Sequence, residues 1–188
     1  MLDCLDALDW VARDPEHLGF DEKRIALYGG SAGGHLCLMV ALAQTAYTDC
    51  ERKNVDIRAI VDCNGPTDLR MIPENHWSNA IHDVLKITFG GSYQQMPEAY
   101  REFSPMTYLD HVQNPPSILI VHGDCDDLVP IDQSERLFSE GKKRGWDVQM
   151  YVLHHAGHDF LPKGYNRTIP CFSSIFAVAE QFLCSRLL

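Results

Sequence analysis

One serine framed by four glycines constrains the fold of this chain more than any other feature. The stretch Gly29-Gly30-Ser31-Ala32-Gly33-Gly34 follows a short apolar run at 24–28 and precedes residues 36–43, which are apolar on all sides. The first run is typical of a strand and the second of a buried helix. The chain is therefore predicted to pass from a strand through a sharp turn at Ser31 into a helix.

The same stretch contains the pattern G-x-S-x-G at 29–33. In this pattern the flanking glycines allow a tight turn that projects a strained serine above a sheet. The helix that follows places the positive end of its dipole beside the hydroxyl, and the backbone N–H of Ala32 is the expected donor to an oxyanion. A glycine-rich phosphate-binding turn is the competing interpretation, but the strand before the turn and the helix after it favour Ser31 as a nucleophile.

A serine hydroxyl needs a base to accept its proton, and the candidates follow the last predicted strand. His154, His155 and His158 lie there within five residues. Because Gly157 frees the backbone to turn the last of them toward the serine, His158 is the expected base. Neighbouring histidines can also hold a metal ion, but no helical spacing such as H-E-x-x-H accompanies these three, so no metal site is predicted.

A carboxylate must orient the histidine, and it is expected in the loop after the preceding strand. The segment 122–130 offers Asp124, Asp126 and Asp127 in that loop. Physical reasoning on the residues does not choose among the three. The order serine, aspartate, histidine along the chain is the order of the α/β-hydrolases.

The remaining elements alternate between strand and helix. Further strands are predicted at 57–63, 117–122 and 148–153, and helices at 2–13, from 132 to Gly145, and at 172–188. Asp132-Gln133-Ser134-Glu135 resembles a capping box that opens its helix. The alternation predicts the α/β class, with a parallel sheet of about four strands and helices on both faces.

The length of 188 residues and 45% apolar content predict one domain over residues 1–188. Residues 66–112 break the alternation with prolines, a Gly-Gly pair and several aromatic side chains. A segment of this length is too long for a simple crossover, so we expect a helical cap insertion over the site. His76, Trp77 and His82 fall within it. We expect Trp77 to contact substrate, although ordinary packing explains it equally well.

Three motifs together resemble a known family. They are Gly-Gly-Ser-Ala-Gly-Gly-His-Leu at 29–36, His-Gly-Asp-Cys-Asp-Asp-Leu-Val-Pro at 122–130, and Ala-Gly-His at 156–158. The chain resembles the carboxylesterase branch of the α/β-hydrolase superfamily, which includes hormone-sensitive-lipase-like esterases and acetyl and feruloyl esterases that act on plant polysaccharides. In that family the catalytic acid is the fourth residue after the histidine of the second motif, which implies Asp126.

The sequence departs from this family at its beginning. Family members carry an earlier region with several strands and an H-G-G-G turn whose backbone N–H groups complete the oxyanion hole, whereas this sequence begins after that region and contains no H-G-G. We therefore expect an N-terminally abbreviated fold that lacks one oxyanion donor, a loss that typically lowers turnover by about 10² to 10³. The nucleophile strand is expected to have an exposed apolar edge, and self-association into a homo-oligomer across that edge is a hypothesis.

Charge and composition exclude several kinds of partner. The net charge of −10 argues against binding to nucleic acid or to anionic membranes. No apolar run is long enough to span a membrane and no signal peptide begins the chain. The odd number of cysteines, seven, without a C-x-x-C pair, predicts reduced thiols and a cytoplasmic location.

The leading hypothesis is a carboxylic ester hydrolase that acts on short acyl esters, with Ser31, His158 and Asp126 as its triad and a small-molecule ester as its partner. This chemistry needs no metal and no organic cofactor. A non-catalytic or weakly active remnant of such an enzyme is the first alternative. A serine peptidase of the prolyl oligopeptidase type is the second, although the propeller domain usual in that enzyme is not encoded here.

Overall fold

The computed structural model describes residues 1–47, 55–71 and 79–188. Its centre is a four-stranded, entirely parallel sheet in the order β1-β2-β3-β4. The strands are β1 (Ile25–Gly30), β2 (Ile57–Cys63), β3 (Ser117–Gly123) and β4 (Val148–Leu153). Because all four strands are parallel, their C-terminal ends lie at one edge, where the loops with the predicted site residues begin.

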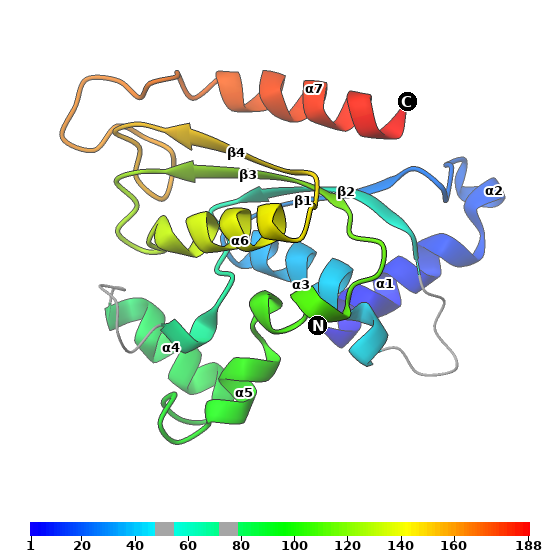
Figure 1. Ribbon diagram of the computed structural model, residues 1–188, viewed down its shortest axis with the longest axis horizontal. Helices are drawn as coiled ribbons and strands as arrows, with labels where there is room; N and C mark the ends of the chain where they lie inside the picture. The colour runs from blue at the N-terminus through cyan, green and yellow to red at the C-terminus, as the bar shows by residue number, and fades with distance from the viewer. Residues whose placement is uncertain (48–54, 72–78) are drawn as a thin grey trace.

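Helices cover both faces of this sheet, which confirms the predicted α/β architecture (Figure 1). One face carries α1 (Leu2–Arg13), α3 (Ala32–Tyr47) and α6 (Asp132–Lys143), and the other carries α7 (Ser174–Leu187). The short α2 (Pro15–Leu18) follows α1. None of the described helices is long and apolar enough to cross a membrane.

Alternation along the strands explains the two layers. In β3, Ile118 and Ile120 belong to the core under α1, α3 and α6, while Leu119 and Val121 belong to the core under α7. All four are essentially inaccessible to solvent. Successive side chains of a strand point to opposite faces, so a continuous apolar run is what a sheet buried on both sides requires.

The described part of segment 66–112 forms a small layer beside the sheet (Figure 1), except that Leu109 in its last turn belongs to the core under α1, α3 and α6. It contains α4 (Asn79–Phe89), α5 (Pro97–Glu102) and the 3₁₀ turns η1 (Leu69–Met71), η2 (Pro105–Thr107) and η3 (Leu109–His111). Leu69, Tyr100 and Val129 are the buried members of its apolar cluster. Val129 comes from the loop after β3, so this layer packs against the loop that carries Asp126. Its function as a cap over substrate stays a prediction.

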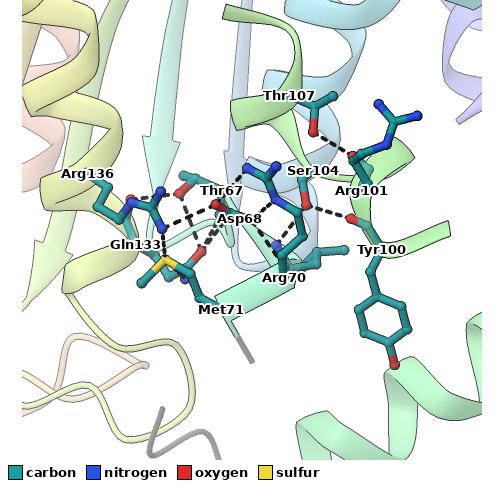
Figure 2. A network of polar contacts seen from close by, with 11 residues as sticks. Thr67, Asp68, Arg70, Met71, Tyr100, Arg101, Ser104, Thr107, Gln133 and Arg136 are labelled. Atoms are coloured by element: carbon teal, nitrogen blue, oxygen red, sulfur yellow. Dashed lines mark hydrogen bonds and ion pairs between the residues drawn. The ribbon is translucent and has the colours of Figure 1, made fainter. Parts of the chain in front are cut away.

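A polar network joins this layer to α6 (Figure 2). The buried Gln133 side chain accepts hydrogen bonds from the backbone N–H groups of Thr67 and Asp68 at 3.0 and 2.7 Å. The Asp68 carboxylate, also buried, accepts two hydrogen bonds from the Arg70 guanidinium. One side chain of α6 therefore fixes the chain direction where it leaves β2.

The predicted capping box at 132–135 is wrong. The residue before the first turn of α6 is Ile131, and it makes no side-chain capping hydrogen bond. The pattern places Asp132 at the cap, but Asp132 is already the first helical residue. Inside the pattern, the Ser134 hydroxyl lies 2.7 Å from Nδ1 of His122, and the Gln133 side chain bonds to Thr67 and Asp68. The two polar residues between Asp132 and Glu135 therefore make tertiary contacts with distant segments.

The strand β1 pairs with β2 on one side, and no described strand pairs with its other side. Tyr28 on this strand is 52% exposed. Self-association through this edge stays a prediction. The six cysteines among the described residues are free, and Cys50 lies outside the described residues.

Candidate active site

The turn between β1 and α3 carries Ser31 in a strained backbone conformation. Its φ is +54°, a left-handed value that costs most residues energy. The serine N–H is held from the side by the carbonyl of Cys63, at 2.8 Å. Ala32 is the first residue of α3, so its N–H has no carbonyl acceptor within the helix and is available at the helix N-terminus.

The glycines of this turn allow close approach of backbone to backbone. A Cβ at position 29 would lie 2.4 Å from the carbonyl carbon and oxygen of Gly33, a distance that real atoms do not adopt. A Cβ at position 33 would have nothing within 4 Å. The only left-handed residue of the turn is Ser31 itself. The first glycine of the pattern is therefore required for packing of the turn, and the second is not.

Ser31, His158 and Asp126 form one hydrogen-bonded chain. The Ser31 hydroxyl lies 2.9 Å from Nε2 of His158, and Nδ1 of the same ring lies 2.7 Å from Oδ2 of Asp126. The Asp126 side chain is fully buried, whereas the His158 side chain is 19% exposed. The three residues predicted from the sequence thus come from the ends of β1, β3 and β4 and meet at one edge of the sheet.

The Asp126 carboxylate is held in its ionised form. Burial by itself raises the pKa of this group, but hydrogen bonds from His122, His158 and the backbone N–H groups of Val129 and Leu128 outweigh it and hold the pKa below its usual range. An ionised acceptor requires the proton of the neutral imidazole to be on Nδ1. Nε2 is then free to accept the proton of the Ser31 hydroxyl.

The other two aspartates of the loop have different partners. Asp124 accepts from Nδ1 of His154, at 2.8 Å, and from the backbone N–H of His155. Asp127 is exposed and forms an ion pair with Lys163. Among the three candidates, geometry therefore brings only Asp126 to His158.

The three neighbouring histidines face different groups. His154 contacts Asp124, and His155 stacks on the ring of Tyr165 with 3.6 Å between ring centroids. In the described ranges, no three His, Cys, Asp or Glu side chains are grouped so as to hold a metal ion. Trp77 and His76 lie outside the described residues, so a substrate contact by Trp77 stays a prediction.

Two buried residues of the site were not identified from the sequence. His122 lies beneath Asp126, with Nε2 at 2.8 Å from the carbonyl of Val129 and 3.3 Å from Oδ2 of Asp126. Asn64, directly after β2, contacts the backbones of both Ser31 and His158. The motif at 122–130 contains His122 together with Asp126 and Val129, whereas nothing local to Asn64 indicates its distant partners.

The sequence is similar to a known protein family and to several named proteins. The family model described as BD-FAE matches residues 1–140. Esterase LipC of Mycobacterium tuberculosis is 28% identical over 196 residues, which cover 99% of this chain and 47% of LipC. The uncharacterized peptidase YuxL of Bacillus subtilis is 28% identical over 165 residues, covering 88% of this chain and 23% of YuxL. The chain thus spans about half or less of the length of these relatives.

A solved structure has the same architecture. The thermophilic esterase Est2 of Thermogutta terrifontis, with butyrate bound, superposes with a TM-score of 0.72 and 22% sequence identity. The superposition covers 97% of this chain and 64% of Est2. At this level of identity the likeness establishes the fold.

Proposed function

Because the chain belongs to the BD-FAE family, which is of the α/β-hydrolase type, we propose that it is a serine esterase that cleaves short acyl esters through an acyl-enzyme intermediate. The single observation that carries the proposal is the unbroken hydrogen-bond chain from the Ser31 hydroxyl through His158 to the buried Asp126. An ionised carboxylate, an oriented imidazole and a strained serine on a strand-to-helix turn are the parts that acyl transfer requires.

In the acylation half, Oγ of Ser31 attacks the ester carbonyl while Nε2 of His158 accepts the hydroxyl proton. Asp126 stabilises the positive charge that this proton places on the imidazole. The carbonyl oxygen becomes an oxyanion and accepts a hydrogen bond from the backbone N–H of Ala32 at the start of α3, where the helix dipole also favours negative charge. As the carbon–oxygen ester bond breaks, His158 returns the proton to the departing alcohol.

In the deacylation half, water takes the place of the alcohol. His158 accepts a proton from the water as its oxygen attacks the acyl carbonyl. The tetrahedral intermediate then breaks its bond to Oγ of Ser31, which regains the proton from His158, and the carboxylic acid leaves. Every proton is accounted for by one imidazole, so the mechanism uses no cofactor.

The preference for short acyl groups is supported by the comparisons. LipC is named an esterase, and the Est2 structure has butyrate, a short-chain carboxylate, bound. A peptidase of the prolyl oligopeptidase type is the second candidate, favoured by the similarity to YuxL, which is named an uncharacterized peptidase. The two functions share the triad and differ in the bond that is cleaved.

A burst assay tests the proposal. The purified chain is mixed with p-nitrophenyl acetate, butyrate and octanoate, and with an aminoacyl p-nitroanilide as the peptidase substrate, beside Ser31→Ala as the control. We expect a nitrophenol burst with acetate and butyrate that Ser31→Ala lacks. Cleavage of the anilide alone would favour the peptidase function. If folded wild-type protein cleaves none of these substrates, both the esterase and the peptidase functions are rejected, and a non-catalytic remnant of such an enzyme is favoured.

A further inference from the structure

We propose that Asn64 is a positioning residue that fixes the nucleophile turn and the histidine loop to each other. The inference rests on the proposed function, because it concerns the same reaction. Asn64 is the first residue after β2 and is 2% exposed. Its φ of +49° is left-handed, a conformation that asparagine adopts more readily than most residues.

The amide oxygen of Asn64 contacts the backbone of the nucleophile, Ser31. Oδ1 accepts the backbone N–H of Ser31 at 3.0 Å, beside the carbonyl of Cys63 at 2.8 Å. Ser31 has a left-handed φ, and such backbone strain persists only where surrounding contacts hold it. The amide oxygen is one of two acceptors that do so.

The amide nitrogen of Asn64 contacts the backbone of the base, His158. Nδ2 donates to the backbone carbonyl of His158 at 2.6 Å, while the ring of the same residue contacts Ser31 and Asp126. Ser31 and His158 are 127 residues apart in the chain, yet one planar amide joins their backbones. The backbone N–H of Asn64 in turn donates to Val121 of β3, the strand that leads to Asp126.

These contacts bear on the distance between nucleophile and base. Proton transfer needs the Ser31 hydroxyl within hydrogen-bond reach of Nε2, and a displacement of about 1 Å can cost about 10²-fold in rate. The loop that carries His158 contains no helix or strand between β4 and α7, only isolated β-bridges between His154 and Ile169 and between Ala156 and Pro162. A direct link from its backbone to the nucleophile turn therefore restricts the separation that governs catalysis.

The requirement is for an amide rather than for a polar side chain of this size. Asparagine offers an acceptor and a donor in one plane, and the N–H of Ser31 and the carbonyl of His158 determine which end faces which. In Asn64→Asp the acceptor for Ser31 remains, but a second carboxylate oxygen faces the carbonyl oxygen of His158. In Asn64→Gly the left-handed backbone is tolerated and both side-chain contacts are lost.

Gln44 provides a matched control. Its side chain also clamps two backbone groups, donating to the carbonyl of Val55 at 3.1 Å and accepting its N–H at 3.3 Å. It lies twelve residues beyond the start of α3, which is about 18 Å along the helix. Gln44→Ala therefore removes an equivalent clamp far from the reacting atoms.

The test compares Asn64→Gly, Asn64→Asp and Gln44→Ala with the wild-type chain. For each, kcat and KM for p-nitrophenyl acetate, the rate of covalent modification by a fluorophosphonate and the thermal unfolding midpoint are measured. We expect both Asn64 variants to lose about 10- to 100-fold in kcat and in modification rate, with KM little changed. Gln44→Ala should lower the unfolding midpoint but keep kcat within about twofold.

Three outcomes would overturn the inference. They are wild-type kcat in folded Asn64→Gly or Asn64→Asp, an effect confined to KM, and an equal loss of kcat in Gln44→Ala. If one Asn64 variant does not fold, the other decides the question. A wild-type chain that neither turns over the ester nor reacts with the fluorophosphonate would refute the proposed function, whereas a reactive wild type with equally reactive Asn64 variants would refute the positioning function alone.

Discussion

Replacement of Asp126 by asparagine should abolish most of the activity while leaving the fold intact. Oδ1 of Asp126 accepts the backbone N–H groups of Leu128 and Val129, both at 2.9 Å. An asparagine that keeps these two bonds must place its amide nitrogen where Oδ2 now lies. That nitrogen then faces Nδ1 of His158, now at 2.7 Å, and Nε2 of His122, now at 3.3 Å.

The consequence is a change of tautomer in the base. With an N–H donor in front of it, Nδ1 of His158 must become an acceptor, so the ring proton moves to Nε2 and faces the Ser31 hydroxyl. An imidazole in this form cannot accept the serine proton. The equivalent change in a Ser-His-Asp protease lowers kcat by about 10⁴, and we expect a loss of that order here.

The assay is the pre-steady-state burst with p-nitrophenyl acetate, accompanied by circular dichroism to verify the fold. Asp124→Asn is the matched control, because Asp124 is also bonded to a histidine, His154, but at an exposed site. Its effect on kcat should stay within about threefold, as contacts of exposed ion pairs are weak. Asp126→Asn with kcat within tenfold of the wild type, or a large loss in Asp124→Asn, would refute the assignment of the acid.

Three further predictions concern the surroundings of the triad. Burial raises the pKa of Asp62 to about 6 against the opposing effects of His122 and the Gly65 N–H, so this carboxyl stabilises the fold below pH 4 and loses that contribution as pH rises through 6. In urea unfolding, the stability of Asp62→Asn relative to wild type should therefore increase by up to about 3 kcal/mol between pH 4 and pH 7. A difference between the two proteins that does not change with pH would contradict this. Gly29→Ala should lower kcat by at least about 10²-fold because its Cβ would collide with the Gly33 backbone, whereas Gly33→Ala should retain activity. Equal kcat values in the two variants would refute the packing argument. Gln133→Ala leaves the buried backbone N–H groups of Thr67 and Asp68 without their acceptor and should lower the free energy of unfolding by about 2 to 5 kcal/mol. A decrease in unfolding free energy below about 1 kcal/mol would show that the fold does not depend on this network.

The sheet could be predicted because its strands are short, apolar and buried on both faces. The predicted bounds of β2 and β4 agree with the structure, and α1 likewise spans residues 2–13. The helix after the turn begins at Ala32, earlier than its apolar run at residue 36, because Gly33 and Gly34 of the glycine-rich stretch are themselves helical. Apolar periodicity locates the buried body of a helix better than its ends.

The contacts among the site residues could be predicted only where a motif joins them. The G-x-S-x-G pattern indicates Ser31 and Gly157 indicates His158, but without the family resemblance the residues do not distinguish the three aspartates of one loop. The structure separates them by partner: Asp126 bonds to His158, whereas Asp124 bonds to His154. Partners that come from distant segments leave no local signal, so the sequence around Asn64 does not indicate its contacts with Ser31 and His158.

The most direct test of the account is to identify the acylated residue. The chain is mixed with p-nitrophenyl acetate, quenched in acid within the burst, digested and analysed by mass spectrometry, with Asp126→Asn treated in parallel. The account predicts one acetyl group per chain on Ser31 and almost none in the variant at the same time point. Acetylation of another side chain, such as Cys125, or equal labelling of Ser31 in both proteins, would contradict it.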